Sequence, residues 1–339
     1  MDNFILNGEN EIYYECGYSC DNVIYLNLGD EKYFITDGRY TIDAKENAKA
    51  EVITTKNLLK TTKELLLKKQ IKKLKIDTKK WDYDSYISLS KIVTLQNISD
   101  YSHKKRMIKT PDELEIIKKA VFLGAKAFDE FKNEIEVGLD EFELSYRFKE
   151  KLTSRGKNDL SFEPIVAINE NGAKPHAMVS DKKLKQNDIL LLDAGLKYKR
   201  YCSDRTRTIA INDNLSMSKI QTFKNKEYQK IYDIVLKAQE EALKAIKVGM
   251  KINELDKIAR DVIQNAGYGK YFVHSLGHGV GLDIHEWPYV NSRNETIITE
   301  GMVFTIEPGI YLPNNFGVRI EDMVCINYDS SVEIMSEYI

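Results

Sequence analysis

The chain has 339 residues, an apolar content of 42% and a formal net charge of −2 at pH 7. This length allows two domains or one large one, with ample chain for a hydrophobic core. The near-neutral charge argues against a nucleic-acid surface, and no apolar stretch approaches the roughly 20 residues that span a bilayer. The start lacks a basic region followed by an apolar run, so we expect a cytoplasmic protein without a secretory signal.

The first third of the chain predicts short strands and helices. We predict strands over Glu11–Cys16, Val23–Leu28 and Lys32–Thr36, where apolar, aromatic and β-branched residues alternate or cluster. We predict a helix over Asn57–Leu74, where leucines recur at helical spacing. The lysines of this segment allow a second interpretation, a surface that binds RNA or lipid. A solvated helix face is favoured, because the leucines supply an inward face.

A domain boundary is predicted at a polar, basic segment over residues 103–109. A strong helix start follows it. Thr110 can act as the N-cap, Pro111 suits the first helical position, and Glu113 can reach back to the cap. We therefore predict a first domain over residues 1–105 and a second over 106–339.

The second part contains an internal repeat. It is carried by Val137-Gly138, Glu143-Leu144 and Gly156 in one copy and by Val248-Gly249, Glu254-Leu255 and Gly267 in the other, with identical spacing. Each copy is predicted to lie on a helix. A longer amphipathic helix precedes each one, over 111–131 and 226–246, and strands follow. Duplicated helix–helix–sheet units predict a pseudo-twofold α+β fold with an antiparallel-rich sheet, in which acidic residues from both halves meet.

Acidic residues stand at strand ends in both copies. Asp193 and Glu307 each close an apolar strand, just before a small residue or proline and a glycine. Asp204 and Glu321 lie across a predicted hairpin from them, so the four carboxylates can face one cavity. A salt bridge or a helix cap would explain any one of these acids. An isolated buried charge is very costly, however, so the four together favour bound metal.

Three of the five histidines fall within residues 274–285. His278 stands between glycines, which let the backbone and a ligand approach closely. One imidazole and four carboxylates make a ligand set for two hard or borderline divalent metal ions. Mn(II) or Co(II) suits this set, and Zn(II) or Fe(II) is possible. The glycine-rich run 277–281 is not read as a phosphate loop, because it lacks the Lys-Ser/Thr ending.

Together these motifs resemble the pita-bread dimetal peptidases, and most of all the Xaa-Pro peptidases, prolidase and aminopeptidase P. The resemblance is carried by Asp193-Ala-Gly, Asp204-Arg-Thr-Arg-Thr, the histidine segment, Ile306-Glu307-Pro-Gly and Val318-Arg319-Ile-Glu321-Asp. Residues 34–40 are similar to the small N-terminal domain of that group. The resemblance therefore implies a creatinase-like domain over 1–105 and a pita-bread catalytic domain over 106–339.

The resemblance implies five metal ligands. Asp193 would chelate one ion, Asp204 and Glu321 would bridge both, and His278 and Glu307 would complete the second. Glu307 would also act as general base and then as general acid.

The resemblance also implies four groups that face the substrate. His285 and His176 would stabilise the oxyanion or help to protonate the leaving nitrogen. His274 and Arg319 would line the subsite after the scissile bond. None of these positions departs from the family pattern, so the chain is expected to be an active enzyme.

The implied activity is hydrolysis of Xaa-Pro bonds by a dimetal-activated hydroxide, which releases the N-terminal residue from small peptides with proline in second position. A homodimer is implied, with no nucleic-acid or membrane partner. Methionine aminopeptidase-like and creatinase-like hydrolases on the same fold are the alternatives. The extra N-terminal domain argues against the first, and the complete ligand set argues against the second and against a non-catalytic relative. Dipeptidase and longer-peptide aminopeptidase are not separated.

Overall fold

The computed structural model describes residues 3–335, so the outermost ends of the two predicted domains, 1–2 and 336–339, lie outside the described residues. The chain divides into two compact units, Met1–Arg106 and Met107–Ile339. Among the described residues, no helix is long and apolar enough to cross a membrane.

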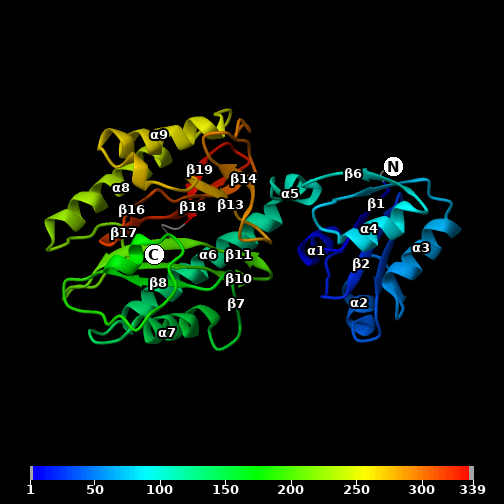
Figure 1. The fold of residues 1–339 in the computed structure, drawn as a ribbon, viewed down its shortest axis with the longest axis horizontal. Helices are drawn as coiled ribbons and strands as arrows, with labels where there is room; N and C mark the ends of the chain where they lie inside the picture. The colour runs from blue at the N-terminus through cyan, green and yellow to red at the C-terminus, as the bar shows by residue number, and fades with distance from the viewer. Residues whose placement is uncertain (1–2, 336–339) are drawn as a thin grey trace. The chain divides into compact units, whose positions relative to one another are not determined.

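The first unit is a mixed six-stranded sheet with the strand order β4-β3-β2-β1-β5-β6 (Figure 1). Its strands are β1 (Asn3–Leu6), β2 (Val23–Leu28), β3 (Glu31–Thr36), β4 (Glu51–Thr54), β5 (Lys73–Ile76) and β6 (Thr94–Asn97). Its helices are α1 (Glu9–Cys16), α2 (Thr41–Asn47), α3 (Leu58–Lys68), α4 (Tyr83–Ser90) and α5 (Tyr101–Arg106). The central pairs β1–β2 and β2–β3 are antiparallel, and the outer strands pair in parallel. The strands predicted over 23–28 and 32–36 are thus confirmed.

The strand predicted over Glu11–Cys16 is wrong, because this segment belongs to helix α1. The buried apolar residues are Ile12 and Cys16, four residues apart on one helical face. Gly17 follows with a φ of 82° and donates its N–H to the carbonyl of Tyr13, which closes the helix. A short apolar run is ambiguous between helix and strand, and here the closing glycine decides for helix.

The helix predicted over Asn57–Leu74 is too long at its C-terminal end. Asn57 caps α3 through a side-chain bond from the Lys60 N–H, but the helix ends at Lys68. Gln70 adopts a φ of 54°, and the chain then enters β5, where Leu74 is buried. The inward leucine face of α3 is confirmed, because Leu58, Leu59, Leu65 and Leu66 pack in the buried core of this unit.

The second unit holds two helix pairs on the outside of a set of antiparallel strands (Figure 1). Its helices are α6 (Pro111–Lys132), α7 (Glu141–Thr153), α8 (Lys226–Ala245) and α9 (Ile252–Asn265), with short 3-10 turns η1 (Asn169–Ala173) and η2 (Gly269–Tyr271). The strands of its first half are β7 (Asp159–Leu160), β8 (Ile165–Ile168), β9 (Ile189–Ala194), β10 (Leu196–Tyr198), β11 (Tyr201–Cys202) and β12 (Arg205–Ala210). The strands of its second half are β13 (Gly277–Gly279), β14 (Glu286–Val290), β15 (Val303–Ile306), β16 (Gly309–Leu312), β17 (Phe316–Arg319), β18 (Asp322–Ile326) and β19 (Val332–Ile334).

The predicted repeat corresponds to two similar halves. One half contains the sheet β12-β9-β8 behind α6 and α7, and the other contains β14-β13-β15-β18-β19 behind α8 and α9. Gly156 follows α7 and Gly267 follows α9, with φ values of 79° and 87°. Only glycine adopts such angles readily, which explains why both copies keep it. The pseudo-twofold, antiparallel-rich architecture is confirmed.

The predicted start of α6 is also confirmed. Thr110 accepts from the Glu113 N–H, the Glu113 carboxylate accepts from the Thr110 N–H, and Pro111 takes the first helical position. This capping box fixes the point at which the second unit begins its first long helix.

A buried ion pair joins the start of this unit to its second half. Lys109 Nζ lies 2.8 Å from Glu286 Oε1, and both side chains are 1% exposed. Substituting Lys109→Met would leave the Glu286 carboxylate buried without its cation. We expect the free energy of unfolding, measured in urea, to fall by about 3–5 kcal/mol. The double substitution K109M/E286L should recover much of the loss, because it leaves no buried charge, whereas an unchanged K109M protein would contradict this account of the pair.

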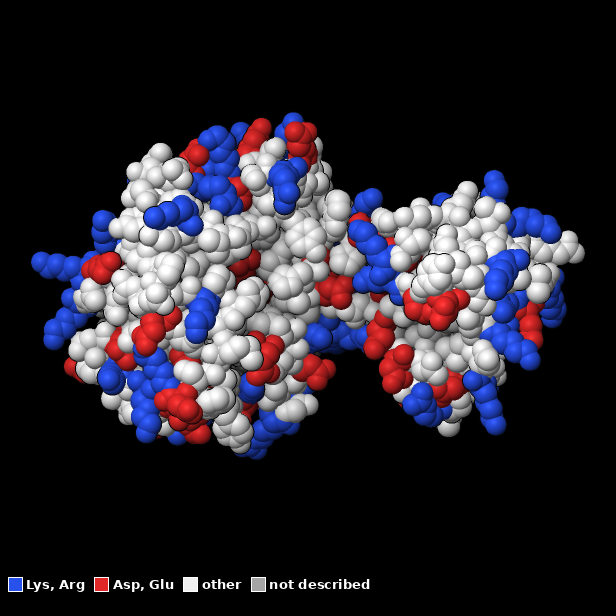
Figure 2. Space-filling model, viewed as in Figure 1, with Lys and Arg blue, Asp and Glu red and all other residues white. Residues whose placement is uncertain are grey.

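Surface charge is mixed on each unit. On the face drawn in Figure 2, basic and acidic residues are interspersed over both units. A field of one sign, which would attract a polyanion over a distance, is not formed on that face.

Candidate metal centre

Four of the five predicted ligands, the acids, lie at or next to strand ends in both halves of the second unit. Asp193 lies on β9, and Asp204 directly precedes β12, the antiparallel neighbour of β9. Glu307 directly follows β15, and Glu321 directly precedes β18, the antiparallel neighbour of β15. His278 is the middle residue of β13. Paired strands therefore bring two acids from each half to one place, as the hairpin pattern predicts.

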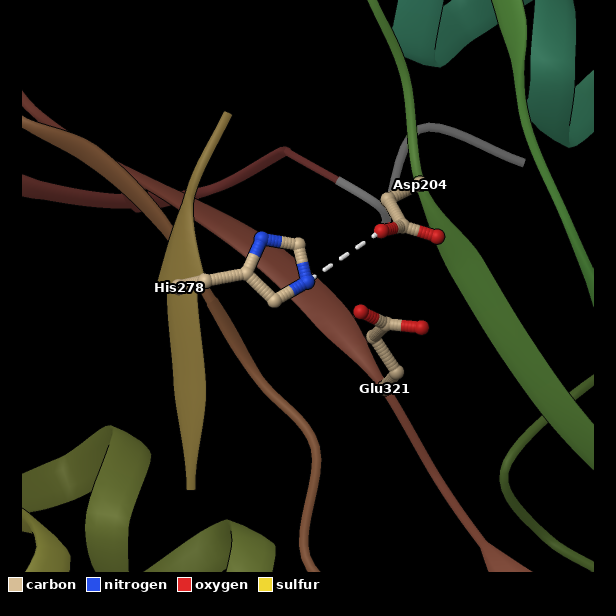
Figure 3. A group of neighbouring side chains, drawn as sticks. All are labelled: Asp204, His278 and Glu321. Atoms are coloured by element: carbon tan, nitrogen blue, oxygen red, sulfur yellow. Dashed lines mark ion pairs between the residues drawn. The ribbon is translucent and has the colours of Figure 1, made fainter. Parts of the chain in front are cut away.

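Three of these residues form a compact group of donors. Ligand atoms of Asp204, His278 and Glu321 lie within 4.8 Å of one another. Figure 3 shows the imidazole of His278 and the two carboxylates converging from three separate segments of the chain. His278 Nε2 is 3.6 Å from Asp204 Oδ2 and 3.3 Å from Glu307 Oε1. One cation could contact several of these atoms at once.

The carboxylates of the centre have open lone pairs. Within the described residues, Asp193 Oδ1, Asp204 Oδ1 and Glu321 Oε1 are buried and have no hydrogen-bond partner. The second oxygens of two of these groups are held by the protein. Arg319 Nη2 donates to Asp193 Oδ2 at 2.5 Å, and Thr206 Oγ1 donates to Glu321 Oε2 at 2.7 Å. Buried acceptors are rarely left without partners, so this set fits bound cations.

The tautomer of His278 also suits a metal. Its Nδ1 lies 3.1 Å from the carbonyl oxygen of Gly279. A carbonyl only accepts, so Nδ1 carries a proton, and Nε2 is the ring nitrogen that faces the carboxylates and would bind a metal. Thr305 Oγ1 accepts from the His278 N–H and donates to Glu307 Oε1 at 3.1 Å. Thr305 thus orients two of the five predicted ligands.

Electrostatics point the same way. Burial raises the pKa of the Asp193 carboxyl. It raises the pKa values of Asp204 and Glu321 well above the usual range of such groups. Neighbouring carboxylates add to each of these rises. Burial also opposes ionisation of Glu307, but the hydrogen bond with His278 and the charges of His278, His274 and Arg319 together outweigh it and lower the pKa to about 2. Crowded buried carboxylates repel one another without a cation between them, so divalent ions would relieve a real electrostatic cost.

The glycines around His278 allow a close backbone approach. A Cβ on Gly277 would lie 2.0 Å from the Thr305 carbonyl oxygen, and one on Gly279 would lie 2.2 Å from the Trp287 carbonyl oxygen. The missing side chains therefore let neighbouring backbone approach β13, and Gly277 also lines the cavity at this centre.

A Gly279→Ala substitution should consequently displace β13 and, with it, His278. We expect weaker metal binding, measured by calorimetry, and a fall of about 1–3 kcal/mol in the free energy of unfolding. The matched control is Gly38→Ala, because no atom lies within 4 Å of a Cβ at that position. Equal metal affinity in G279A and G38A would contradict the assigned role of Gly279.

A cavity of about 460 Å³ opens onto this centre. All nine residues singled out from the sequence line it: His176, Asp193, Asp204, His274, His278, His285, Glu307, Arg319 and Glu321. Its wall also contains apolar residues that sequence reasoning missed, namely Phe162, Ile165, Ile284 and Tyr289. No motif marks them, because isolated apolar residues in strands and loops look like any other core residue.

The histidines outside the ligand set lie around the cavity. The ring of His285 is 4.3 Å from the ring of His278, measured between centroids. Partial desolvation in the cavity wall, together with the nearby His278, lowers the pKa of His285 to about 4. His285 is therefore neutral at pH 7. His176 is exposed, at the rim of the same cavity.

His274 and Arg319 are joined by a residue that sequence reasoning missed. The hydroxyl of Tyr311 is 2.9 Å from His274 Nε2 and accepts from Arg319 Nη1 at 2.7 Å. The same guanidinium also holds Asp193, so Tyr311 links the predicted subsite to a predicted ligand. Tyr311 lies on β16, between Glu307 and Glu321, and that position was its only signal in the sequence.

Two pseudo-symmetric half-sheets that enclose a carboxylate-rich centre with one imidazole define a metal-dependent hydrolase of the pita-bread type. The chain belongs to metallopeptidase family M24, whose model matches residues 115–328. Residues 1–108 match the creatinase/prolidase N-terminal domain. Members of this family use divalent metal ions.

Relatives and solved structures agree with this membership. The chain is 38% identical to a Xaa-Pro dipeptidase of Pyrococcus furiosus over 93% of this chain and 88% of the relative. It is 42% identical to an uncharacterised peptidase of Staphylococcus epidermidis over 72% of this chain, and the match spans 66% of that relative's length. A Xaa-Pro dipeptidase structure from Bacillus anthracis superposes with a TM-score of 0.90 at 32% identity and covers 100% of this chain and 93% of that one. An X-Pro aminopeptidase structure from Thermotoga maritima superposes with a TM-score of 0.88 at 32% identity, and the match covers 100% of this chain and 96% of that one.

Proposed function

We propose that this protein is a metallo-exopeptidase that hydrolyses Xaa-Pro bonds in small peptides and releases the N-terminal residue. The observation that carries the proposal is one cavity whose walls combine the five proposed metal ligands, three of which have a buried carboxylate oxygen without a partner among the described residues, with three further histidines. Relatives named Xaa-Pro dipeptidase and X-Pro aminopeptidase support this substrate over the methionine aminopeptidase-like and creatinase-like alternatives.

Asp193, Asp204, His278, Glu307 and Glu321 would hold two divalent ions. Mn(II) is the ion we favour, with Co(II), Zn(II) or Fe(II) as alternatives, because one imidazole among oxygens is a borderline donor set. When bound, a pair of such ions lowers the pKa of a water molecule and polarises the scissile carbonyl.

The chain's own residues would supply the proton transfers. Glu307 is ionised at neutral pH, so it can accept a proton from water and later deliver it to the proline nitrogen. His285 is neutral at pH 7 and can donate a hydrogen bond to the oxyanion. His176, on the opposite half, can assist with the same charge or with the leaving nitrogen.

The remaining cavity wall suits a proline-containing peptide. His274 and Arg319, linked by Tyr311, would line the subsite after the scissile bond. An Xaa-Pro bond is a tertiary amide without an N–H, so a site that does not need that donor can accept it. Apolar wall residues such as Phe162 and Tyr289 would receive the ring.

Three further assignments accompany this proposal. The domain boundaries, 1–105 and 106–339, are supported by the division of the structure at 106/107. A cytoplasmic location and a homodimer stay predictions that rest on the sequence and the family resemblance.

The experiment that tests the proposal compares Ala-Pro, Gly-Pro and a longer Xaa-Pro peptide with the protein loaded with Mn(II), Co(II) or Zn(II). We expect release of the first residue from the Xaa-Pro substrates, fastest with Mn(II) or Co(II). The ratio between dipeptides and the longer peptide then separates dipeptidase from aminopeptidase. Failure to cleave any Xaa-Pro peptide with any of the three metals would refute the proposal.

A further inference from the structure

A second buried carboxylate lies outside the metal centre, at the start of helix α7. Glu141 is fully buried and accepts four hydrogen bonds from neutral donors. Its Oε1 accepts from the Ile168 N–H at 2.7 Å. Its Oε2 accepts from Asn171 Nδ2 at 2.7 Å, from the Ser180 N–H at 2.8 Å and from the Ser180 hydroxyl at 2.7 Å. Glu141 is not among the residues that line the cavity of the metal donors.

The four donors lie at the two ends of the loop that carries His176. Ile168 and Asn171 are on its incoming side, and Ser180 is on its outgoing side, so one carboxylate ties both sides together. Asn171 reinforces this closure by donating to the carbonyl of Met178 at 2.8 Å. His176 itself is exposed, at the tip of the loop on the cavity rim. The position of its imidazole therefore depends on how the loop is anchored.

A second contact fixes the tip of the loop. Arg319 Nη1 donates to the carbonyl oxygen of Pro175, the residue before His176, at 3.3 Å. Glu141 thus holds the two ends of the loop, and the guanidinium of Arg319, which also binds Asp193, holds its tip.

The other half of the repeat uses a similar device. Asp256, on α9, is fully buried and accepts from the Leu276 N–H at 3.3 Å and from Arg260 Nη2 at 2.9 Å. Arg260 in turn donates to the carbonyl of His274 at 3.0 Å. In each half, then, a buried acid on the shorter helix anchors the backbone that carries a cavity histidine.

We propose that Glu141 is a positioning residue, which acts on the reaction by holding the loop 168–180 and hence the imidazole of His176 against the cavity. This inference rests on the proposed function, because it requires His176 to take part in hydrolysis. Small displacements of a catalytic group reduce the rate strongly, so loosening the anchor should lower turnover without removing any group from the cavity. Glu141→Gln is the informative change, because its amide nitrogen cannot accept the bonds that one carboxylate oxygen accepts now.

The test is a double-mutant cycle on the Mn(II)-loaded full chain, with kcat and KM for Ala-Pro measured for wild type, E141Q, H176A and E141Q/H176A. We expect E141Q to lower kcat on the order of tenfold with little change in KM and unchanged metal content. In the H176A background the same change should have little further effect, because the group being positioned is gone. The control is D140A, which removes the N-cap of the same helix without touching the loop and should leave kcat within about twofold.

Several results would overturn the inference: equal losses from E141Q in both backgrounds, a wild-type rate in E141Q, or a wild-type rate in H176A. If E141Q does not fold, Ser180→Ala removes one donor and enters the same cycle, with a smaller loss and the same dependence on His176. A wild-type protein that cleaves other dipeptides but not Ala-Pro would refute the proposed substrate instead, and the cycle on the cleaved dipeptide would still decide the role of Glu141.

Discussion

Substituting Asp204 or Glu321 by alanine should abolish both metal binding and Xaa-Pro hydrolysis. Each residue has a buried carboxylate oxygen without a partner among the described residues, and each lies within the compact donor group with His278. Both belong to the proposed ligand set, so losing either one would remove a donor that bound metal needs. Metal ions contribute several kcal/mol of transition-state stabilisation, so we expect kcat/KM to fall by roughly three orders of magnitude or more.

The measurement combines metal analysis of purified D204A and E321A with initial rates on Ala-Pro. The matched control is Glu163→Gln, since Glu163 lines the same cavity but pairs with Lys149 and is not among the proposed ligands. It should retain metal and most of its activity. Urea unfolding of the metal-free variants checks that the fold survives. Full activity on Xaa-Pro dipeptides in D204A or E321A would contradict the assignment of these residues as metal ligands.

Removing the metal should have a comparably large and reversible effect. A chelator should reduce hydrolysis to background, and Mn(II) or Co(II) should restore it as the added metal approaches two equivalents per chain. Metal that binds only the folded protein also stabilises it, so the melting temperature should rise on reconstitution. D204A should show neither response.

The readouts are residual activity and melting temperature after dialysis against chelator, each followed through a metal titration. Ca(II) serves as a comparison, because an imidazole ligand suits Mn(II) or Co(II) better than a cation that prefers oxygen alone. An enzyme that is indifferent to the chelator would point to a different chemistry.

The centre could be predicted because its residues carry unusual signals. Acids at the ends of apolar strands and a histidine flanked by glycines stand out in the sequence, and the repeat indicates that the two halves meet. Strand pairing then brings Asp193 near Asp204 and Glu307 near Glu321, as the hairpins require.

What could not be predicted depends on contacts between distant segments. Tyr311 links His274 to Arg319, yet a tyrosine on a strand carries no sign of that role. Glu141 looks like an ordinary first-turn acid of a helix, and only the folded loop shows that it accepts from Ser180. The strand predicted over Glu11–Cys16 is wrong because a short apolar run fits both the helical and the strand period. The glycine that ends the helix does so through its positive φ, which the sequence pattern does not show.

The most direct test of the central claim is the rate on Ala-Pro against Ala-Ala, measured with the same Mn(II)-loaded preparation. The account predicts that Ala-Pro is cleaved at least about tenfold faster in kcat/KM, because filling an apolar slot with the proline ring contributes on the order of 1–3 kcal/mol of discrimination. Equal rates on the two dipeptides, or faster cleavage of Ala-Ala, would contradict an Xaa-Pro peptidase.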